Sequence, residues 1–202
     1  MKEVNRKALI GILRMFIILP ALVFVPAWTL NYWQGWACLA SFFVPAIAIS
    51  VWAAKNDPAL LERRLKAGPG GEKELGQKVV QLVAGVAFIA DFAVSALDHR
   101  LGWSSVPAYA AIAGDALIVL GFVIVYRVFK VNSFTSGIIE VAAEQKVIST
   151  GPYSVVRHPM YTGSLMTLFA IPLALGSWLG VRGPAHTTEA VAPGANFYEF
   201  QE

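Results

Sequence analysis

The chain has 202 residues, of which 56% are hydrophobic and only 14% are charged, and its mean hydropathy is +0.59. Soluble domains carry about a quarter of their residues as charges, so this composition excludes an ordinary soluble domain and indicates a membrane protein. The net charge of +3 is small, and the basic residues lie between apolar runs, which argues against nucleic-acid binding. The single cysteine, Cys38, lies inside an apolar run, so the sequence predicts neither a disulfide framework nor a cysteine-based metal site.

Five apolar runs approach the roughly 20 residues that a transmembrane helix needs. In chain order they cover residues 8–30, 33–54, 79–97, 106–128 and 160–180. The first run is too long for the core of a signal peptide and ends without a cleavage site, so we interpret it as a retained helix. The predicted fold class is therefore an all-α integral membrane protein with about five transmembrane helices.

Lysine and arginine residues are concentrated at one end of the predicted helices. They precede the first run, fill the connection between the second and third, and follow the fourth, whereas the other two connections carry only Arg100. Basic residues accumulate on the cytoplasmic side of a membrane, so the sequence predicts a multi-pass protein with a cytoplasmic N-terminus. The connection that contains Arg157 and His158 is predicted to be cytoplasmic as well.

The connection after the second run contains the signals of a short helix. Asp57 is suited to cap it, and Pro58 suits its first position. The favoured interpretation is an interfacial helix without a catalytic role, with the arginines that follow at the lipid phosphates. The leucines expected to face lipid are Leu60, Leu61 and Leu65.

Two carboxylates, Asp91 and Asp115, lie inside the third and fourth runs. An intramembrane carboxylate is a candidate for a functional site. Neither run contains a basic partner, so a structural role in hydrogen bonding is the favoured interpretation for both.

The most informative segment precedes the fifth run and reads GPYSVVRHPMYTG over residues 151–163. His158 precedes a proline and is directed out of the helical region, so a helix is predicted to begin at Pro159. The unpaired N–H groups of its first turn are suited to bind a carboxylate or phosphate. Arg157 adds a planar donor group that suits a carboxylate.

Tyr153 and Tyr161 add ring faces that attract a cation. Anion donors beside cation-binding rings suit a zwitterion with an additional positive centre, such as S-adenosylmethionine. These residues alone leave one alternative open, in which Arg157 and His158 only anchor the chain at the headgroups and the tyrosines belong to the interfacial belt.

The stretch QKVISTGPY (residues 145–153) followed by RHPMYTG (residues 157–163) closely resembles the isoprenylcysteine carboxyl methyltransferase family and the related phospholipid methyltransferases. The resemblance implies methyl transfer from S-adenosylmethionine to a lipid-borne or isoprenylcysteine-like carboxylate at the cytoplasmic face. The catalytic candidates are Arg157 and His158. The cofactor contacts that the resemblance implies are Gln145, Lys146, Val147, Ile148, Tyr153, His158, Pro159, Met160 and Tyr161.

The identity of the methyl acceptor stays open. A carboxylate needs no general base, whereas an amine or phospholipid headgroup needs one, for which His158 is the candidate. The expected partners are a lipid or lipidated small-molecule substrate and membrane lipids, with no nucleic acid and no metal. Sterol-type membrane reductases that use NADPH carry a similar Arg-His-Pro loop and provide an alternative function.

The C-terminal residues depart from the family pattern. In the family a further helix returns to the cytoplasm and ends in an arginine and two glutamates, whereas residues 183–202 show no helical period and no apolar run. The expected division is a methyltransferase-like domain over residues 1–182 and an irregular tail over residues 183–202. Without the returning helix, the chain is expected to be an inactive or weakly active member of the family.

Overall fold

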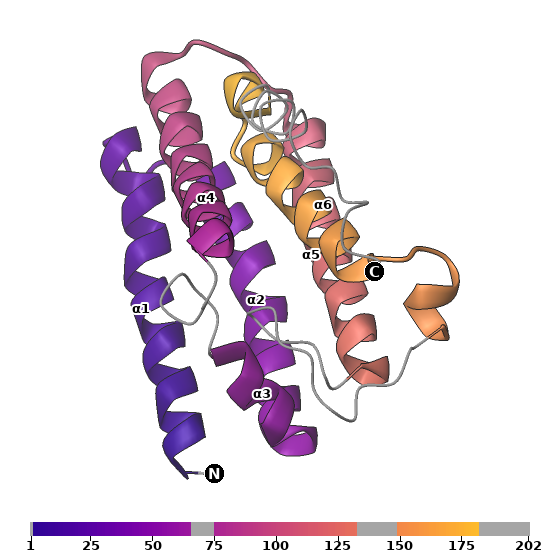
Figure 1. Cartoon of the computed structure of the whole chain (residues 1–202). Helices are drawn as coiled ribbons and strands as arrows, with labels where there is room; N and C mark the ends of the chain where they lie inside the picture. The colour runs from indigo at the N-terminus through magenta and orange to yellow at the C-terminus, as the bar shows by residue number, and fades with distance from the viewer. Residues whose placement is uncertain (1, 66–74, 133–148, 182–202) are drawn as a thin grey trace.

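The computed structural model describes residues 2–65, 75–132 and 149–181 (Figure 1). Within these ranges the structure contains helices and no β-strand, which confirms the predicted all-α class. The elements are α1 (Lys2–Ala27), α2 (Trp33–Asn56), α3 (Pro58–Leu65), α4 (Leu75–Leu101), α5 (Ala108–Val131), a 3₁₀ turn η1 (Gly151–Ser154) and α6 (Pro159–Ala174).

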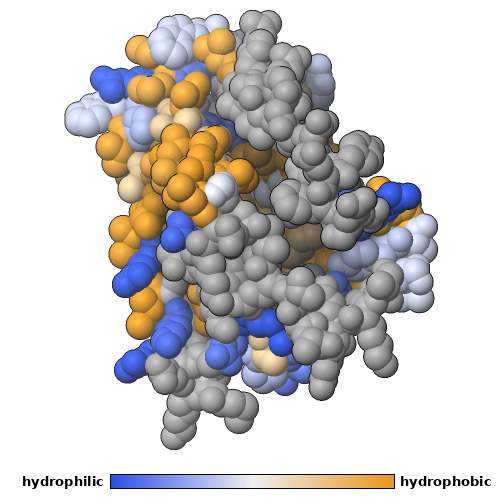
Figure 2. All heavy atoms as spheres, viewed as in Figure 1, coloured by the Kyte–Doolittle hydropathy of each residue, from blue (hydrophilic) through white to orange (hydrophobic). Residues whose placement is uncertain are grey.

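Four helices of the described chain are long and apolar enough to cross a membrane. They are α1, α2, α4 and α5, with candidate spans at residues 6–27, 33–56, 78–101 and 108–131. Large apolar side chains are exposed along them, and in Figure 2 hydrophilic residues gather toward the lower end of the molecule, where the N-terminus lies. A lipid-facing surface explains this exposure, so the prediction of an integral membrane protein is confirmed.

The fifth predicted run, residues 160–180, is divided in the structure. Its first part is α6, which has 16 residues and ends at Ala174. Gly176 has a left-handed backbone with φ of 76°, and its N–H donates to the Leu173 carbonyl at 3.0 Å. The N–H of Ser177 donates to the Pro172 carbonyl at 2.9 Å, which completes the hydrogen-bond pattern of a Schellman motif. This motif ends the helix although the apolar run continues.

Helices α5 and α6 lie side by side and antiparallel, in contact through small residues (Figure 1). A Cβ atom on Gly114 would lie 2.5 Å from the backbone nitrogen of Ala174. A Cβ atom on Gly163 would lie 2.8 Å from the carbonyl oxygen of Gly121. Both distances are shorter than van der Waals contact, so glycine permits an approach that other residues would prevent. This close contact holds α6, and with it the loop that precedes α6, against α5.

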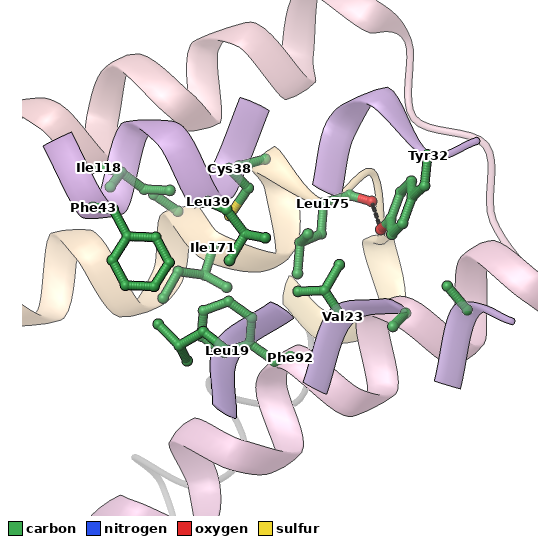
Figure 3. Packing of buried hydrophobic residues seen from close by; sticks show 14 residues of the cluster. Leu19, Val23, Tyr32, Cys38, Leu39, Phe43, Phe92, Ile118, Ile171 and Leu175 are labelled. Atoms are coloured by element: carbon green, nitrogen blue, oxygen red, sulfur yellow. Dashed lines mark hydrogen bonds between the residues drawn. The ribbon is translucent and has the colours of Figure 1, made fainter. Parts of the chain in front are cut away.

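The main core lies where α1, α2, α4, α5 and α6 meet (Figure 3). Cys38 is buried in this core, as expected of a packing residue. The hydroxyl of Tyr32 donates to the carbonyl of Leu175 at 2.5 Å, drawn as the dashed line in Figure 3. Burial raises the pKa of Tyr32 well above its ordinary value, so the phenol stays protonated and can donate.

Buried carboxylates differ in their surroundings. Asp115 accepts a hydrogen bond from the Ser41 hydroxyl at 2.9 Å, as predicted. Asp91 is only 5% exposed, and its two carboxylate oxygens have no hydrogen-bond partner among the described residues. The expected hydrogen-bonding role therefore holds for Asp115 and is wrong for Asp91 within the described part of the chain.

The short helix α3 begins as predicted but does not face lipid as predicted. The carboxylate of Asp57 accepts a hydrogen bond from the Leu60 N–H at 3.0 Å, which confirms the cap. However, Leu60 is 0% exposed and Leu61 is 7% exposed, so only Leu65 among the three leucines is exposed. The prediction was wrong for Leu60 and Leu61 because α3 turns back onto the ends of α2 and α5 and buries both leucines there.

Candidate functional site

Helix α6 begins at the residue that was predicted from the sequence. Helix α6 begins at Pro159, and His158 takes a non-helical backbone with φ of −128°. The N–H of Thr162 donates to the His158 carbonyl at 3.2 Å. The N–H groups of Met160 and Tyr161 precede this first intrahelical bond and point toward the loop. This end of α6 therefore presents backbone donors to the loop.

The start of α6 is set back from the end of α5. Gly163 packs against Gly121, which lies ten residues before the last residue of α5, whereas Gly163 lies only four residues after Pro159. At 1.5 Å per residue, the start of α6 is about 9 Å short of the end of α5. Pro159 is fully buried there, whereas residues 154–158 of the preceding loop are exposed.

Two of the predicted contact residues face the bundle. Tyr153 and Met160 pack against a group of buried side chains at the ends of α2, α3 and α5, here called the α3–α5 cluster. Tyr153 lies in η1, and its hydroxyl accepts a hydrogen bond from the side-chain amide of Asn132 at 2.9 Å. The cluster consists of Ala53, Leu60, Leu61, Val128 and Phe129.

Three other predicted residues face outward. Arg157 and His158 are exposed, and the ring of Tyr161 is 64% exposed. The rings of His158 and Tyr161 have centroids 5.8 Å apart and are inclined by 50°. The structure thus divides the predicted site into an inward pair and an outward group. Pro159, also a predicted contact, is fully buried at the first position of α6. The predicted contacts Gln145 to Ile148 lie outside the described residues, as does the tail of residues 183–202.

A cavity of about 810 Å³ lies between α5 and η1, here called the α5–η1 cavity. This volume is within the range of about 300–1,000 Å³ that is typical of small-molecule sites. Arg127 and Lys130 place positive charge on its wall, and the Lys130 ammonium lies 5.8 Å from the ring centroid of Tyr126. The lining residues are Leu120, Val123, Ile124, Tyr126, Arg127, Lys130, Val131, Gly151, Pro152 and Val155.

Arg127 and Lys130 were not among the predicted site residues. Their charges served only to predict how the chain is oriented in the membrane. Val123, Arg127 and Lys130 are spaced by four and three residues, so they lie on one face of a helix. That spacing could have been used to predict that both basic residues lie on the same side of the helix and line one site. Gly151 has a φ of 62°, and a Cβ atom there would lie 3.2 Å from the Val131 side chain, so glycine lets η1 approach the end of α5 closely.

A second cavity of about 230 Å³ lies between α2, α3 and α5, here called the α3 cavity. The guanidinium carbon of Arg64 lies 5.5 Å from the ring centroid of Phe129. Burial lowers the pKa of Arg64 below its ordinary value, although a guanidinium remains charged at any physiological pH. The predicted position of this arginine at lipid phosphates is therefore wrong, since its side chain turns toward the bundle. The lining residues are Ala46, Ile49, Ser50, Ala53, Leu60, Leu61, Arg64, Phe122, Val125 and Phe129.

Among the residues that the structure describes, no group of three or more histidine, cysteine, aspartate or glutamate side chains is placed to hold a metal ion. The two cavities are lined by apolar side chains, aromatic rings and the cationic groups of Arg64, Arg127 and Lys130. Such groups bind and orient an anionic or zwitterionic molecule. The described residues predicted to contact the cofactor line neither cavity; they are Tyr153, His158, Pro159, Met160 and Tyr161.

Comparison with known proteins identifies the segment that builds the α5–η1 cavity. Residues 109–199 match the family described as phospholipid methyltransferase. The match includes nearly all of α5, together with η1, the Arg157-His158 loop and α6, and it confirms the resemblance predicted from the sequence. No curated protein and no solved structure is significantly similar to the chain. Residues 109–199 of this membrane protein are thus similar to the phospholipid methyltransferase family, and this similarity supports methyl transfer as the general class of activity.

Proposed function

We propose that this protein transfers a methyl group from S-adenosylmethionine to a lipid-borne acceptor at the cytoplasmic face of a membrane. The observation that carries the proposal is the α5–η1 cavity, which is of small-molecule size and has Arg127 and Lys130 on its wall. It is formed by the segment that matches the phospholipid methyltransferase family. A cationic cavity suits the carboxylate end of the cofactor.

The residues present fit S-adenosylmethionine by their chemistry. Arg127 and Lys130 line the cavity and would supply positive charge for the carboxylate of the cofactor. Arg157 is exposed and does not line the cavity, and we propose that it adds charge from the loop. The ring of Tyr161 is largely exposed and is suited to contact the positive sulfur. Tyr153 is proposed to support the site from behind, because its hydroxyl is bonded to Asn132 and its ring packs on the α3–α5 cluster. Gln145, Lys146, Val147 and Ile148 are proposed to line the same site.

The bound cofactor supplies an electrophilic methyl group on a sulfonium. The residues of this chain would hold and orient it. Attack by a carboxylate neutralises charge, so a water-poor site favours that reaction. For an amine acceptor, the exposed His158 is the proposed proton acceptor.

We also propose a multi-pass topology with the N-terminus and the Arg157-His158 loop in the cytoplasm, because basic residues are concentrated at that end of the helices. Cysteine labelling in intact cells tests this orientation. A cysteine at Trp103, between α4 and α5, is expected to react with an impermeant reagent, and one at Lys55 is expected to be protected. The reverse pattern would contradict the topology. The native Cys38 is buried and should add little background.

Titration of the purified protein in micelles with S-adenosylmethionine and with NADPH tests the proposed function. Saturable binding of S-adenosylmethionine, weakened by Tyr161→Leu, is the expected result. Binding of NADPH instead would favour a sterol-type reductase, and binding of neither would remove the basis of the proposal.

A further inference from the structure

Helix α4 carries a stripe of buried polar side chains. Asp91, Ser95 and Asp98 are spaced by four and three residues, so they lie on one face of the helix. Asp91 is 5% exposed, and Ser95 and Asp98 are 0% exposed. Asp91 lies near the middle of the candidate span of residues 78–101, at a depth where the membrane supplies no water. Each polar group of the stripe therefore depends on a partner inside the bundle.

The two carboxylates of the stripe differ in their partners. Asp98 accepts hydrogen bonds from the N–H and the hydroxyl of Ser104 and from the hydroxyl of Ser177. In contrast, both carboxylate oxygens of Asp91 and the hydroxyl of Ser95 are buried without a hydrogen-bond partner among the described residues. A buried charge is costly unless it is paired or binds an ion. The described residues thus provide donors for one carboxylate of the stripe and none for the other.

The buried oxygens of Asp91 and Ser95 suit a small cation. Side chains four residues apart on a helix have Cβ atoms about 5–6 Å apart, so a carboxylate and a hydroxyl at these positions can contact one ion. Hard cations prefer oxygen ligands. A monovalent cation neutralises a single carboxylate, whereas a divalent cation would leave a net positive charge in the membrane interior. This composition differs from a group of three or more histidine, cysteine, aspartate or glutamate side chains, which the described residues do not form.

The polar stripe leads to the end of the bundle opposite η1 (Figure 1). At 1.5 Å per residue, Asp98 lies about 10 Å from Asp91 along the axis of α4. Its partner Ser104 is only partly buried, in the connection between α4 and α5, so polar groups continue from the stripe to the surface. Gly180, in the turn after α6, packs so closely on Ser95 that a Cβ atom would overlap the serine hydroxyl. A cation would therefore enter from the end of the bundle that lies away from the candidate cofactor loop.

We propose that Asp91 and Ser95 form a binding site for a small monovalent cation in the interior of the bundle. The carboxylate supplies the negative charge, and the hydroxyl supplies a further oxygen ligand. The bound ion offsets the cost of burying the carboxylate, so it stabilises the folded protein in proportion to how fully the site is occupied. Sodium is the probe ion for this site.

Thermal unfolding of the full chain in maltoside micelles tests the site. The protein is heated in sodium chloride and in choline chloride at equal ionic strength, and its helix content is followed by circular dichroism. Sodium is expected to raise the unfolding temperature of the wild type in a saturable manner, and radiolabelled sodium is expected to be retained in equilibrium dialysis. If sodium neither raises the unfolding temperature nor is retained, Asp91 is neutralised by a proton alone and the proposal is overturned.

Variants then locate the ion. Asp91→Asn should abolish the sodium response, because it removes the charge at nearly constant volume. Ser95→Ala should require about tenfold more sodium for the same response, as for the loss of one polar partner. Asp115→Asn is the matched control and should respond as the wild type does, because the carboxylate that it removes already accepts a hydrogen bond from Ser41. A full sodium response in Asp91→Asn would overturn the assignment of the ion to this site.

A second variant keeps the test decisive if Asp91→Asn fails to fold. Asp91→Leu replaces the buried carboxylate with an apolar side chain, so in choline chloride it should be at least as stable as the wild type. Replacement of choline by sodium should then leave its unfolding temperature unchanged. A rise equal to that of the wild type would place the ion elsewhere and would overturn the proposal.

Discussion

Replacement of Asp98 by alanine is expected to be among the most destabilising single changes in the described bundle. Asp98 is completely buried near the end of α4. It accepts the N–H of Ser104 at 2.8 Å, the hydroxyl of Ser104, and the hydroxyl of Ser177 at 2.5 Å. These bonds connect α4 to the α4–α5 connection and to the turn that follows α6. Alanine would remove all of them together.

The magnitude follows from what the alanine would leave behind. Hydrogen bonds to a carboxylate are typically worth about 1.5–3 kcal/mol each, but they are not additive within one network. Ser104 is partly exposed and can regain water, whereas Ser177 is completely buried and cannot. We therefore expect Asp98→Ala to lower the free energy of unfolding by about 3 kcal/mol, roughly the loss of two hydrogen bonds to a carboxylate that do not add fully.

Unfolding in mixed micelles by titration with dodecyl sulfate, followed by far-UV circular dichroism, measures this loss. Asp115→Ala is the matched control, because Asp115 is half-buried and accepts a side-chain hydrogen bond from one serine, Ser41. The control should cost about 1 kcal/mol. If the two variants lose the same free energy, the Asp98 network does not hold α4 to the end of α6 and the reasoning is refuted.

Four further predictions concern single residues. Gly163→Ala should destabilise the protein by about 1–3 kcal/mol in the same unfolding assay, because a Cβ atom would meet the Gly121 carbonyl. Gly85→Ala should instead stabilise it by about 0.5–1 kcal/mol, since nothing lies within 4 Å of that Cβ position; destabilisation there would refute the comparison. Asp91→Leu should stabilise the bundle by about 1–3 kcal/mol by removing buried oxygens without described partners, and a loss of stability would reveal a partner. His158→Ala should weaken S-adenosylmethionine binding by about 0.5–1.5 kcal/mol in calorimetric titrations, and unchanged affinity would return the loop to the role of a membrane anchor.

Features set by adjacent residues were predicted well. The start of α3 follows from Asp57 and Pro58, and the start of α6 follows from His158 and Pro159, because capping and proline sterics act over one turn. The end of α6 was not predicted. The length of the run was judged from its hydrophobicity, which does not reveal that Gly176 adopts a left-handed backbone and ends the helix.

The parts of the site that depend on distant contacts were not predicted. The burial of Leu60 and Leu61 results from packing against α5, and the inward direction of Tyr153 results from the same cluster. Neither has a periodic signal in the local sequence. The position of Arg64 was not predicted either. From the sequence alone, a basic residue at the end of an amphipathic segment is expected to contact lipid headgroups, whereas in the structure Arg64 lines the α3 cavity.

Photochemical cross-linking of methyl-labelled S-adenosylmethionine to the purified protein, with the labelled peptides mapped by mass spectrometry, tests the central claim most directly. We expect label in the peptides that contain the end of α5 and residues 149–163, and we expect this label to be lost when Arg127 and Lys130 are both replaced by glutamine. Label confined to α1 and α2, or label that is unchanged in the double variant, would contradict the assignment of the cofactor to the α5–η1 cavity.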